Sequence, residues 1–381
     1  MPKKIYLIAC EASGDLHAAE LIAAFRERAP EVEFRGLGGP QTALAGMTVL
    51  EDMTKISALG LSDVLRQYFR YRKIFYRTLA DLKHWQPDAL ILVDSPAFNL
   101  RLAKKVKKAL PQLPILYYIC PQIWAWGHRR IVTVKKNISK MFSILPFEVD
   151  YYQKAKVPCE FVGHPLLDHV KTSADRTTLR KDFGIATDEL AVGLLPGSRS
   201  SEVRRILPVM LKTAGLICRD VPQIIFYIAR SDNVEDSVYD DILAKAAVTF
   251  RNIHNRYYDY VSAMDFALVA SGTATLQTAL VGTPFFLLYK ASLSTYLLGK
   301  QLIRVPYLGL VNLLAGRPIV PEFIQYDAHP ETIAHEAKFI LLNAEYRQKM
   351  QEEFAEVREN LGKGGASRRA ADAMLTFLAS R

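Results

Sequence analysis

The nine residues from Leu194 to Glu202 read LLPGSRSSE, the end of an apolar run followed by a Pro-Gly-Ser-Arg turn and a helical pattern. A second stretch, from Val269 to Thr275, reads VASGTAT and repeats the order of apolar run, small residues and helix start. Glycine lets the backbone approach a ligand closely, and a helix start offers unpaired N–H groups and positive dipole character. The two turns therefore predict a site that holds one nucleotide diphosphate from two sides.

Apolar runs alternate with helical patterns on both sides of these turns. We expect strands at residues 5–10, 34–37, 89–93, 115–119, 141–145 and 161–162 in the first half, and at 191–195, 224–229, 266–270 and 285–288 in the second. Runs rich in Ile, Leu and Val are typical of strands buried on both faces, and such alternation is typical of parallel α/β sheets. The pattern predicts two Rossmann-like, doubly wound domains facing a cleft, with ligands at the carboxyl ends of the strands.

The chain of 381 residues is too long for one ordinary core, which supports two domains. The polar stretch 168–188 is the expected connection. We therefore expect an N-terminal domain at 1–170, a C-terminal domain with the two glycine turns at 171–365, and a last helix at 366–381, for which a return to the first domain is one arrangement. The sequence has neither a secretory signal nor an apolar run near the ~18 residues that span a bilayer, so we expect a cytoplasmic location.

The net charge of +10 lies mostly in the first 170 residues, which indicates an anionic partner. Cations recur at helical spacing within residues 56–79 and predict one basic helix face, formed by Arg66, Arg70, Lys73 and Arg77. Phe69 and Tyr76 are expected on other sides of that helix. Such a helix is suited to an anionic membrane surface, although a solvated basic face is the plainer alternative. No recognised motif supports nucleic-acid binding, and the four cysteines lack metal-ligand spacing.

Polar residues also follow the first-half strands. The candidate acceptor or cleft residues are Glu11, Ser13, Gly14, Asp15, Trp124 and Trp126. Ser13 or Asp15 is alternatively a helix N-cap, and the tryptophans are alternatively an aromatic core plug. Asp94 directly follows the apolar run 89–93, where a carboxylate can take a proton from a hydroxyl nucleophile, or can cap an Asx turn before Pro96.

The two turns of the second half supply the candidates for holding a diphosphate. These candidates are Ser198, Arg199, Glu202, Ser271, Gly272, Thr273, Ala274 and Gln277. Arg199 adds a fixed charge and a forked donor, and Gln277 lies one helical turn beyond the second turn, near where a ribose would sit. An ordinary capped helix start and a surface arginine without a ligand are the alternatives.

Eight segments together resemble the bacterial lipid-A-disaccharide synthase family, in order and spacing, over essentially the whole chain. They are EASGD at 11–15, VDSPAFN at 93–99, PQIWAW at 121–126, ILPFE at 144–148, FVGHP at 161–165, LLPGSR at 194–199, ASGTA at 270–274 and VNLLAGR at 311–317. The resemblance implies a GT-B glycosyltransferase that joins UDP-2,3-diacylglucosamine to 2,3-diacylglucosamine 1-phosphate (lipid X), at the inner face of the inner membrane. The implied products are the lipid A disaccharide 1-phosphate and UDP.

By the same resemblance, the N-terminal domain at 1–170 binds the acceptor and the C-terminal domain at 171–365 binds the UDP-sugar. Asp94 falls on the catalytic carboxylate, and Arg199, Ser271–Ala274 and Asn312 fall on donor-site positions. No cofactor or metal is implied, and a homodimer is left open. Gln277 stands where relatives often have Glu, and it keeps an acceptor oxygen but loses the charge. The alternatives are another UDP-N-acetylglucosamine-using GT-B transferase or 2-epimerase, and a non-enzymatic peripheral membrane protein that senses UDP-sugars.

Overall fold

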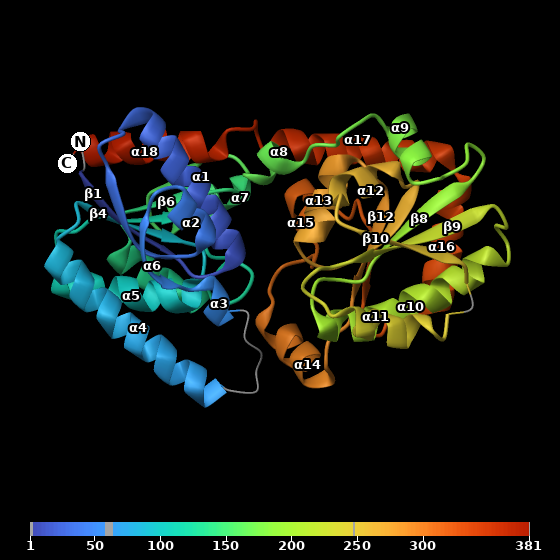
Figure 1. The fold of residues 1–381 in the computed structure, drawn as a ribbon, viewed down its shortest axis with the longest axis horizontal. Helices are drawn as coiled ribbons and strands as arrows, with labels where there is room; N and C mark the ends of the chain where they lie inside the picture. The colour runs from blue at the N-terminus through green and yellow to red at the C-terminus, as the bar shows by residue number, and fades with distance from the viewer. Residues whose placement is uncertain (1–2, 58–63, 247, 381) are drawn as a thin grey trace. The chain divides into compact units, whose positions relative to one another are not determined.

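The computed structural model describes residues 3–57, 64–246 and 248–380, with the backbone alone at 56, 57 and 64–68. The chain forms two compact units, each built on a parallel sheet (Figure 1). The first unit comprises Met1–Pro165 and Leu361–Arg381, and the second comprises Leu166–Asn360. The last helix, α18 (Ala366–Ala379), therefore belongs to the first unit, where Asp372 pairs with Arg28 of α1 (Ala12–Arg28) at 2.8 Å.

The sheet of the first unit has the strand order β3-β2-β1-β4-β5-β6-β7. Its strands are β1 (Lys4–Ala9), β2 (Glu33–Gly38), β3 (Thr48–Asp52), β4 (Ala89–Val93), β5 (Ile115–Tyr118), β6 (Lys140–Ser143) and β7 (Cys159–Phe161). Its other helices are α2 (Pro40–Leu44), α3 (Thr54–Ser57), α4 (Val64–Trp85), α5 (Pro96–Ala109), the 3-10 helix η2 (His128–Arg130), α6 (Ile131–Asn137) and α7 (Pro146–Lys154).

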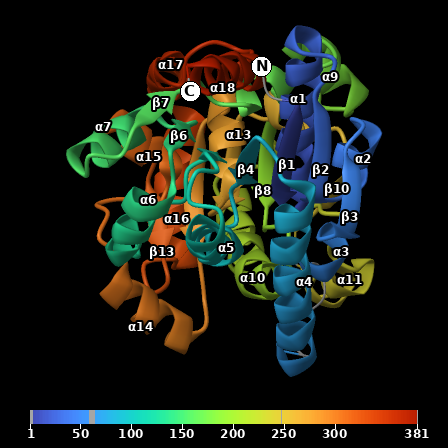
Figure 2. The same ribbon diagram turned by 90° about the vertical axis from the view of Figure 1, so that its left-hand side faces the viewer.

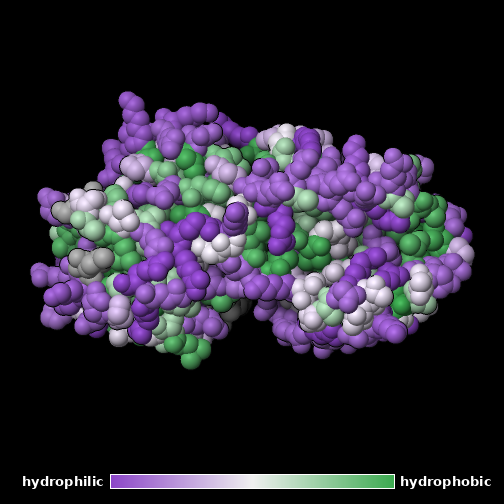
Figure 3. Space-filling model, turned by 90° about the horizontal axis from the view of Figure 1, so that it is seen from above, coloured by the Kyte–Doolittle hydropathy of each residue, from purple (hydrophilic) through white to green (hydrophobic). Residues whose placement is uncertain are grey.

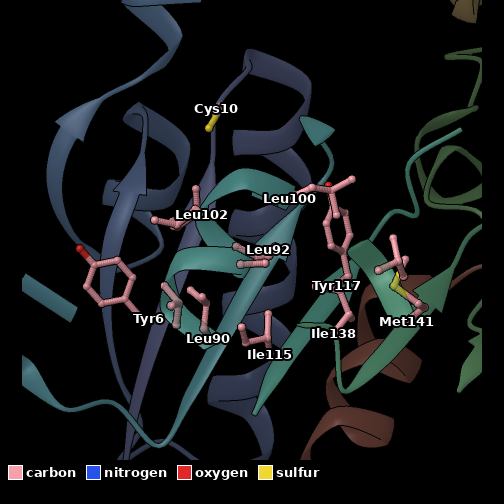
Figure 4. Packing of buried hydrophobic residues seen from close by; sticks show 14 of the residues in the cluster. Tyr6, Cys10, Leu90, Leu92, Leu100, Leu102, Ile115, Tyr117, Ile138 and Met141 are labelled. Carbon is pink, nitrogen blue, oxygen red and sulfur yellow. The ribbon is translucent and has the colours of Figure 1, made fainter. Parts of the chain in front are cut away.

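Alternate residues of the first-unit strands build a core on each face of this sheet. Leu90, Leu92 and Tyr117 lie in the core on one side (Figure 4), which α4 and α5 cover in Figure 2. Ile91 and Val93 lie in the opposite core, with α1 and α18. Both faces are buried because helices cover each of them, and this burial explains why the central strands are almost entirely apolar.

The second unit has the strand order β10-β9-β8-β11-β12-β13. Its strands are β8 (Leu190–Leu195), β9 (Ile224–Arg230), β10 (Phe250–His254), β11 (Phe266–Ala270), β12 (Phe285–Tyr289) and β13 (Glu322–Ile324). Its helices are α8 (Leu166–His169), α9 (Arg176–Asp182), α10 (Ser200–Cys218), α11 (Asp236–Leu243), α12 (Tyr257–Ala263), α13 (Thr273–Val281), α14 (Leu293–Leu302), α15 (Leu310–Ala315), α16 (Pro330–Leu342) and α17 (Ala344–Asn360).

The sequence analysis missed three strands, and all three lie at sheet edges. They are β3 (TVLED), β10 (FRNIH) and β13 (EFI). An edge strand keeps one side open to solvent, so its composition is more polar and lacks the apolar run of a central strand. The interior strands match the predicted runs to within one or two residues at each end.

Strand register brings the predicted turns to one edge of each sheet. In the first unit Ala9 pairs with Val93, so Glu11 and Asp94 follow at the same edge. In the second unit Leu195 pairs with Val269, which places the two glycine turns next to each other. This edge lies at the carboxyl ends of the strands, where open α/β sheets bind ligands.

Candidate functional site

A pocket of about 560 Å³ opens at the carboxyl edge of the second sheet. Eight predicted donor-site residues line it together: Ser198, Arg199, Glu202, Ser271, Gly272, Thr273, Ala274 and Gln277. The sequence analysis missed further lining residues, among them Ser231 after β9 and Asn255 after β10. Their position directly after a strand is the feature of the sequence that could have identified them. For Asn255 this feature was not visible, because the sequence analysis did not recognise β10 as a strand.

The first turn of this pocket depends on Gly197. Its φ of +111° lies in the left-handed region, and an added Cβ would come within 2.5 Å of Glu202 Oε2. Glu202 Oε2 accepts a hydrogen bond from the Ser198 N–H at 3.2 Å, and Glu202 Oε1 accepts one from Arg199 Nη1 at 2.9 Å. The Glu202 carboxylate therefore occupies two of the donors that the turn offers to an anion, and Arg199 is otherwise exposed to solvent.

The second turn begins α13 and has open space beside its glycine. Gly272 has a φ of +150°, and an added Cβ would meet no atom within 4 Å. The Gly272 carbonyl accepts hydrogen bonds from both the N–H and the hydroxyl of Thr275. These bonds stabilise the first turn of α13. Further along α13, Gln277 Nε2 donates to Tyr258 Oη at 3.0 Å. This bond uses one of the two amide hydrogens, so Gln277 can offer its amide oxygen and its second N–H to a ribose hydroxyl.

Asn312, the ninth predicted donor-site residue, is not among the residues that line this pocket. The side chain is buried, and its Oδ1 accepts from the N–H groups of Ile319 and Val320 at 2.9 Å each. Its Nδ2 donates to the Val320 carbonyl and to Glu322 Oε1, both at 2.8 Å. The amide thus ties α15 to the chain that enters β13.

In the first unit the structure brings the carboxyl groups of Glu11 and Asp94 to the same end of neighbouring strands. The Ser95 hydroxyl donates to Glu11 Oε1 at 3.4 Å. Burial, and secondarily the charge of Glu11, raise the pKa of Asp94 above the ordinary carboxyl value. The Asp94 carbonyl accepts from Asn99 Nδ2 at 2.7 Å and from the Tyr117 hydroxyl. These bonds fix the Asp94 backbone and leave its carboxylate as the group that can react.

Asp15 forms hydrogen bonds within the first unit. Its side chain is buried, and its Oδ1 accepts from the N–H of Gly39 and from both the N–H and the hydroxyl of Thr42. Its Oδ2 accepts from the Gln41 N–H at 2.9 Å. Asp15 thus stabilises the start of α2 rather than the start of its own helix. Ser13 is exposed at the first turn of α1, whereas Gly14 is buried.

The two tryptophans have different surroundings. Trp124 is buried, as the core alternative has it, and its Nε1 donates to Glu148 Oε1 at 2.8 Å. Burial raises the pKa of Glu148 to about 8, and the sequence analysis did not single this residue out. Trp126 is exposed, with the Arg130 guanidinium 4.7 Å from its ring centroid. Trp126 and Arg130 together present an aromatic face and a cation at the surface.

The exposed face of α4 differs from the sequence expectation. Lys73 and Arg77 are exposed as expected, and Arg70 pairs with Glu51 at 3.1 Å, whereas the side chain of Arg66 lies outside the described residues. Phe69 and Tyr76 were expected elsewhere but are more than half exposed. Residues 69, 73 and 76 follow at helical spacing, so these aromatics lie on the same face as Lys73. Within the part of the chain that the structure describes, none of the helices has the length and apolar character needed to cross a membrane.

Known proteins match this chain over nearly its whole length, and not only at these motifs. A family model described as lipid-A-disaccharide synthetase matches residues 5–377. The chain is 41% identical over 377 residues to the lipid-A-disaccharide synthase of Syntrophus aciditrophicus (strain SB), covering 99% of this chain and 98% of that protein. It is 38% identical over 363 residues to lipid-A-disaccharide synthase 1 of Legionella pneumophila (strain Lens), covering 95% of this chain and 94% of that protein.

Solved structures resemble this one at much lower sequence identity. A putative UDP-N-acetylglucosamine 2-epimerase from Listeria monocytogenes has a TM-score of 0.64 at 12% identity, covering 100% of this chain and 98% of its own. A glycosyltransferase from Rickettsia africae has a TM-score of 0.59 at 10% identity, covering 99% and 98%. These likenesses confirm the predicted GT-B fold. The full-length sequence matches go further, and they show that the chain belongs to the lipid-A-disaccharide synthase family of glycosyltransferases.

Proposed function

We propose that this chain transfers the 2,3-diacylglucosamine unit of its UDP derivative to the 6-hydroxyl of lipid X, with inversion, releasing UDP. Family membership supports the reaction class. The observation that carries the donor half is that eight of the nine predicted donor-site residues line one pocket. That pocket is bounded by two helix starts and an arginine, the groups that best accommodate a diphosphate.

In the proposed step, Asp94 removes the proton from the acceptor hydroxyl as that oxygen bonds to the anomeric carbon. The bond between the anomeric carbon and the UDP oxygen breaks at the same time. A raised pKa makes Asp94 a stronger base than an ordinary carboxylate. Arg199 and the N–H groups of residues 271–274 stabilise the negative charge that develops on UDP, and the proposal assigns no part of this task to a metal.

We place the acceptor near the carboxyl ends of the first-unit strands, beside Asp94 and Glu11. The exposed Trp126 ring can pack against a sugar, and Arg130 next to it can pair with the 1-phosphate of lipid X. We also propose that α4 contacts an anionic inner-membrane surface, because its exposed face carries Phe69 and Tyr76 among Lys73 and Arg77. Aromatic side chains suit the headgroup layer, and the cations suit the phosphates.

Mass spectrometry of the products tests the reaction directly. With both lipid substrates present, we expect a disaccharide monophosphate and one UDP for each disaccharide. Conversion of UDP-N-acetylglucosamine without any acceptor would instead indicate an epimerase. Binding of UDP without release of UDP from the two substrates would indicate a sensing protein. Either outcome would overturn the proposal.

A further inference from the structure

Helix α14 presents apolar side chains to solvent over its whole length. Every residue of this ten-residue helix keeps part of its surface exposed. The exposed fractions lie between 40% and 58% for Leu293, Leu297, Leu298, Leu302 and the following Ile303. Single exposed leucines are ordinary, but five within eleven residues form a patch of the kind that marks an interaction surface. The side of the second unit that carries α17 is, by contrast, largely hydrophilic (Figure 3).

The charge around α14 favours an anionic partner. From Phe266 to Pro321 the sequence contains neither Asp nor Glu, although it contains Lys290, Lys300 and Arg304. Lys300 and Arg304 lie among the exposed leucines and are themselves exposed. If α14 packed against α14 of a second copy, these cations would approach each other without a carboxylate from this segment to pair with. An interfacial helix with leucines and cations suits an anionic bilayer, where acyl chains and phosphates lie within one helix diameter.

Contacts within the second unit hold α14 in place. The Ala291 N–H donates to Gln325 Oε1 at 3.0 Å, and Gln325 Nε2 donates to the Ala291 carbonyl at 3.2 Å. Ser292 caps the helix by accepting from the Thr295 N–H, and Tyr296 packs edge-on against the ring of Tyr326 at 5.7 Å. The exposed leucines therefore belong to an anchored helix and not to a loose loop.

The position of α14 relates it to the nucleotide pocket. The preceding strand β12 runs parallel to β11, with Leu288 opposite Ala270, so both strands end at the same edge of the sheet. The pocket opens at this edge, and α14 leaves from it and stands apart from the rest of the second unit (Figures 1 and 2). A surface that holds α14 would accordingly lie next to the strand ends that line the pocket.

We propose that α14 lies in the surface of an anionic lipid bilayer, with its leucines and Ile303 among the acyl chains and with Lys300 and Arg304 at the phosphates. This contact belongs to the second unit, is separate from the α4 surface of the first unit, and does not depend on the proposed reaction. It predicts that the nucleotide-binding unit itself is anchored at the membrane.

The first test is co-flotation of the full chain with vesicles of phosphatidylglycerol and phosphatidylethanolamine. The triple substitution Leu297→Ser, Leu298→Ser and Leu302→Ser is expected to weaken binding at least tenfold, since about 0.8 kcal/mol is lost per CH₂ withdrawn from the membrane. Leu342→Ser, at an exposed leucine of α16, is the matched control and should bind like the parent. Both variants should bind UDP normally. Equal binding by the triple variant and the parent would overturn the proposal, as would failure of the parent to bind vesicles.

A second measurement reports on α14 alone, because α4 can also hold the chain on vesicles. The three tryptophans of the sequence, Trp85, Trp124 and Trp126, lie in the first unit. Leu298→Trp adds one to α14, and lipids brominated near the top of the acyl chains should quench its added fluorescence. A vesicle-bound variant whose added fluorescence is not quenched would refute insertion. If the triple variant shifts a dimer to a monomer in the absence of lipid and the quenching is absent, α14 is instead a contact between copies.

Discussion

Replacing Asp94 with asparagine isolates the proposed base from the backbone around it. Asp94 and Ser95 have φ values of +46° and +45°, in the left-handed region that Asn and Asp adopt more readily than other non-glycine residues. The bonds from Asn99 and Tyr117 go to the Asp94 carbonyl and survive the substitution. Asp94→Asn therefore keeps the turn and removes the ability to accept a proton.

The expected loss in turnover follows from what a positioned base supplies. General base catalysis contributes about 10²- to 10⁴-fold, or about 3–5 kcal/mol of barrier, so kcat should fall within that range. The affinity for UDP should stay within about twofold of the parent, because the nucleotide pocket belongs to the second unit. Initial rates of UDP release at saturating substrates, with calorimetric titration of UDP, measure the two quantities. A kcat within tenfold of the parent would refute the role of Asp94 as the base.

The same variant should be more stable than the parent at neutral pH. Burial and the nearby Glu11 raise the pKa of Asp94 in the folded state, so the fold favours the protonated carboxyl. A raised pKa gives stability that is present below the unfolded value of 3.8 and is lost as the pH rises through the folded value. The melting temperature of Asp94→Asn should therefore exceed that of the parent at pH 7 and approach it below about pH 4. A variant that is less stable at pH 7 would show that the turn had been damaged.

Three further substitutions test the pockets and the core. Arg199→Ala should weaken UDP binding about 10- to 100-fold in calorimetry, as expected for a charge-assisted hydrogen bond, and unchanged affinity would contradict the diphosphate assignment. Glu202→Gln keeps an acceptor for the Ser198 N–H but removes the negative charge, so UDP should bind up to about fivefold more tightly; weaker binding would show that Glu202 supports the ligand. Glu148→Gln should melt above the parent at pH 8.5 and match it near pH 5, since the pKa raised to about 8 makes the parent lose stability as the pH rises from about 4.5 to 8; parallel melting curves would contradict a neutral Glu148.

The hydrogen-bond geometry around Glu148 also favours its protonated form. The Ser143 hydroxyl has one hydrogen but lies within hydrogen-bonding distance of two acceptors, the Leu145 carbonyl and Glu148 Oε2. A protonated Glu148 resolves this conflict by donating to Ser143, which then donates to Leu145. Trp124 donates to the other carboxyl oxygen. Glutamine can make the same two contacts, to Ser143 and Trp124, which makes it the matched replacement for the protonated form.

The interior strands of the fold could be predicted because a strand that is buried on both faces consists of a continuous apolar run, which can be recognised in the sequence. Three of the four edge strands could not, because β3, β10 and β13 have too few neighbours to require such a run. The face of α4 was misjudged for a related reason. Helical spacing groups residues on one side, but it does not say which side packs, and the structure buries Ile74 and Leu82 while leaving Phe69 in solvent.

The candidate site was predictable where the ligand groups follow a strand directly. The two glycine turns and Asp94 each follow a strand directly. Strand register alone brings Asp94 to the carboxyl edge of the first sheet and the two turns to the carboxyl edge of the second. Asp15 and Asn312 have the same polar character in equally suggestive segments. Their partners are backbone N–H groups elsewhere in the chain, at Gly39 and Thr42 for Asp15 and at Val320 for Asn312. Sequence spacing does not reveal that a side chain already accepts hydrogen bonds from backbone N–H groups elsewhere in the chain.

In the proposed site, Glu202 orders the first glycine turn before a ligand binds. Its carboxylate accepts hydrogen bonds from the Ser198 N–H and the Arg199 guanidinium, which are the groups assigned to the diphosphate. The turn is thereby held by an anion of its own. A diphosphate carries more charge than one carboxylate and can bind both turns of the pocket, so it can displace Glu202 from Arg199 without leaving that cation unpaired. Ordering the turn in advance lowers the entropy lost on binding, and repulsion between Glu202 and the incoming phosphates opposes that gain.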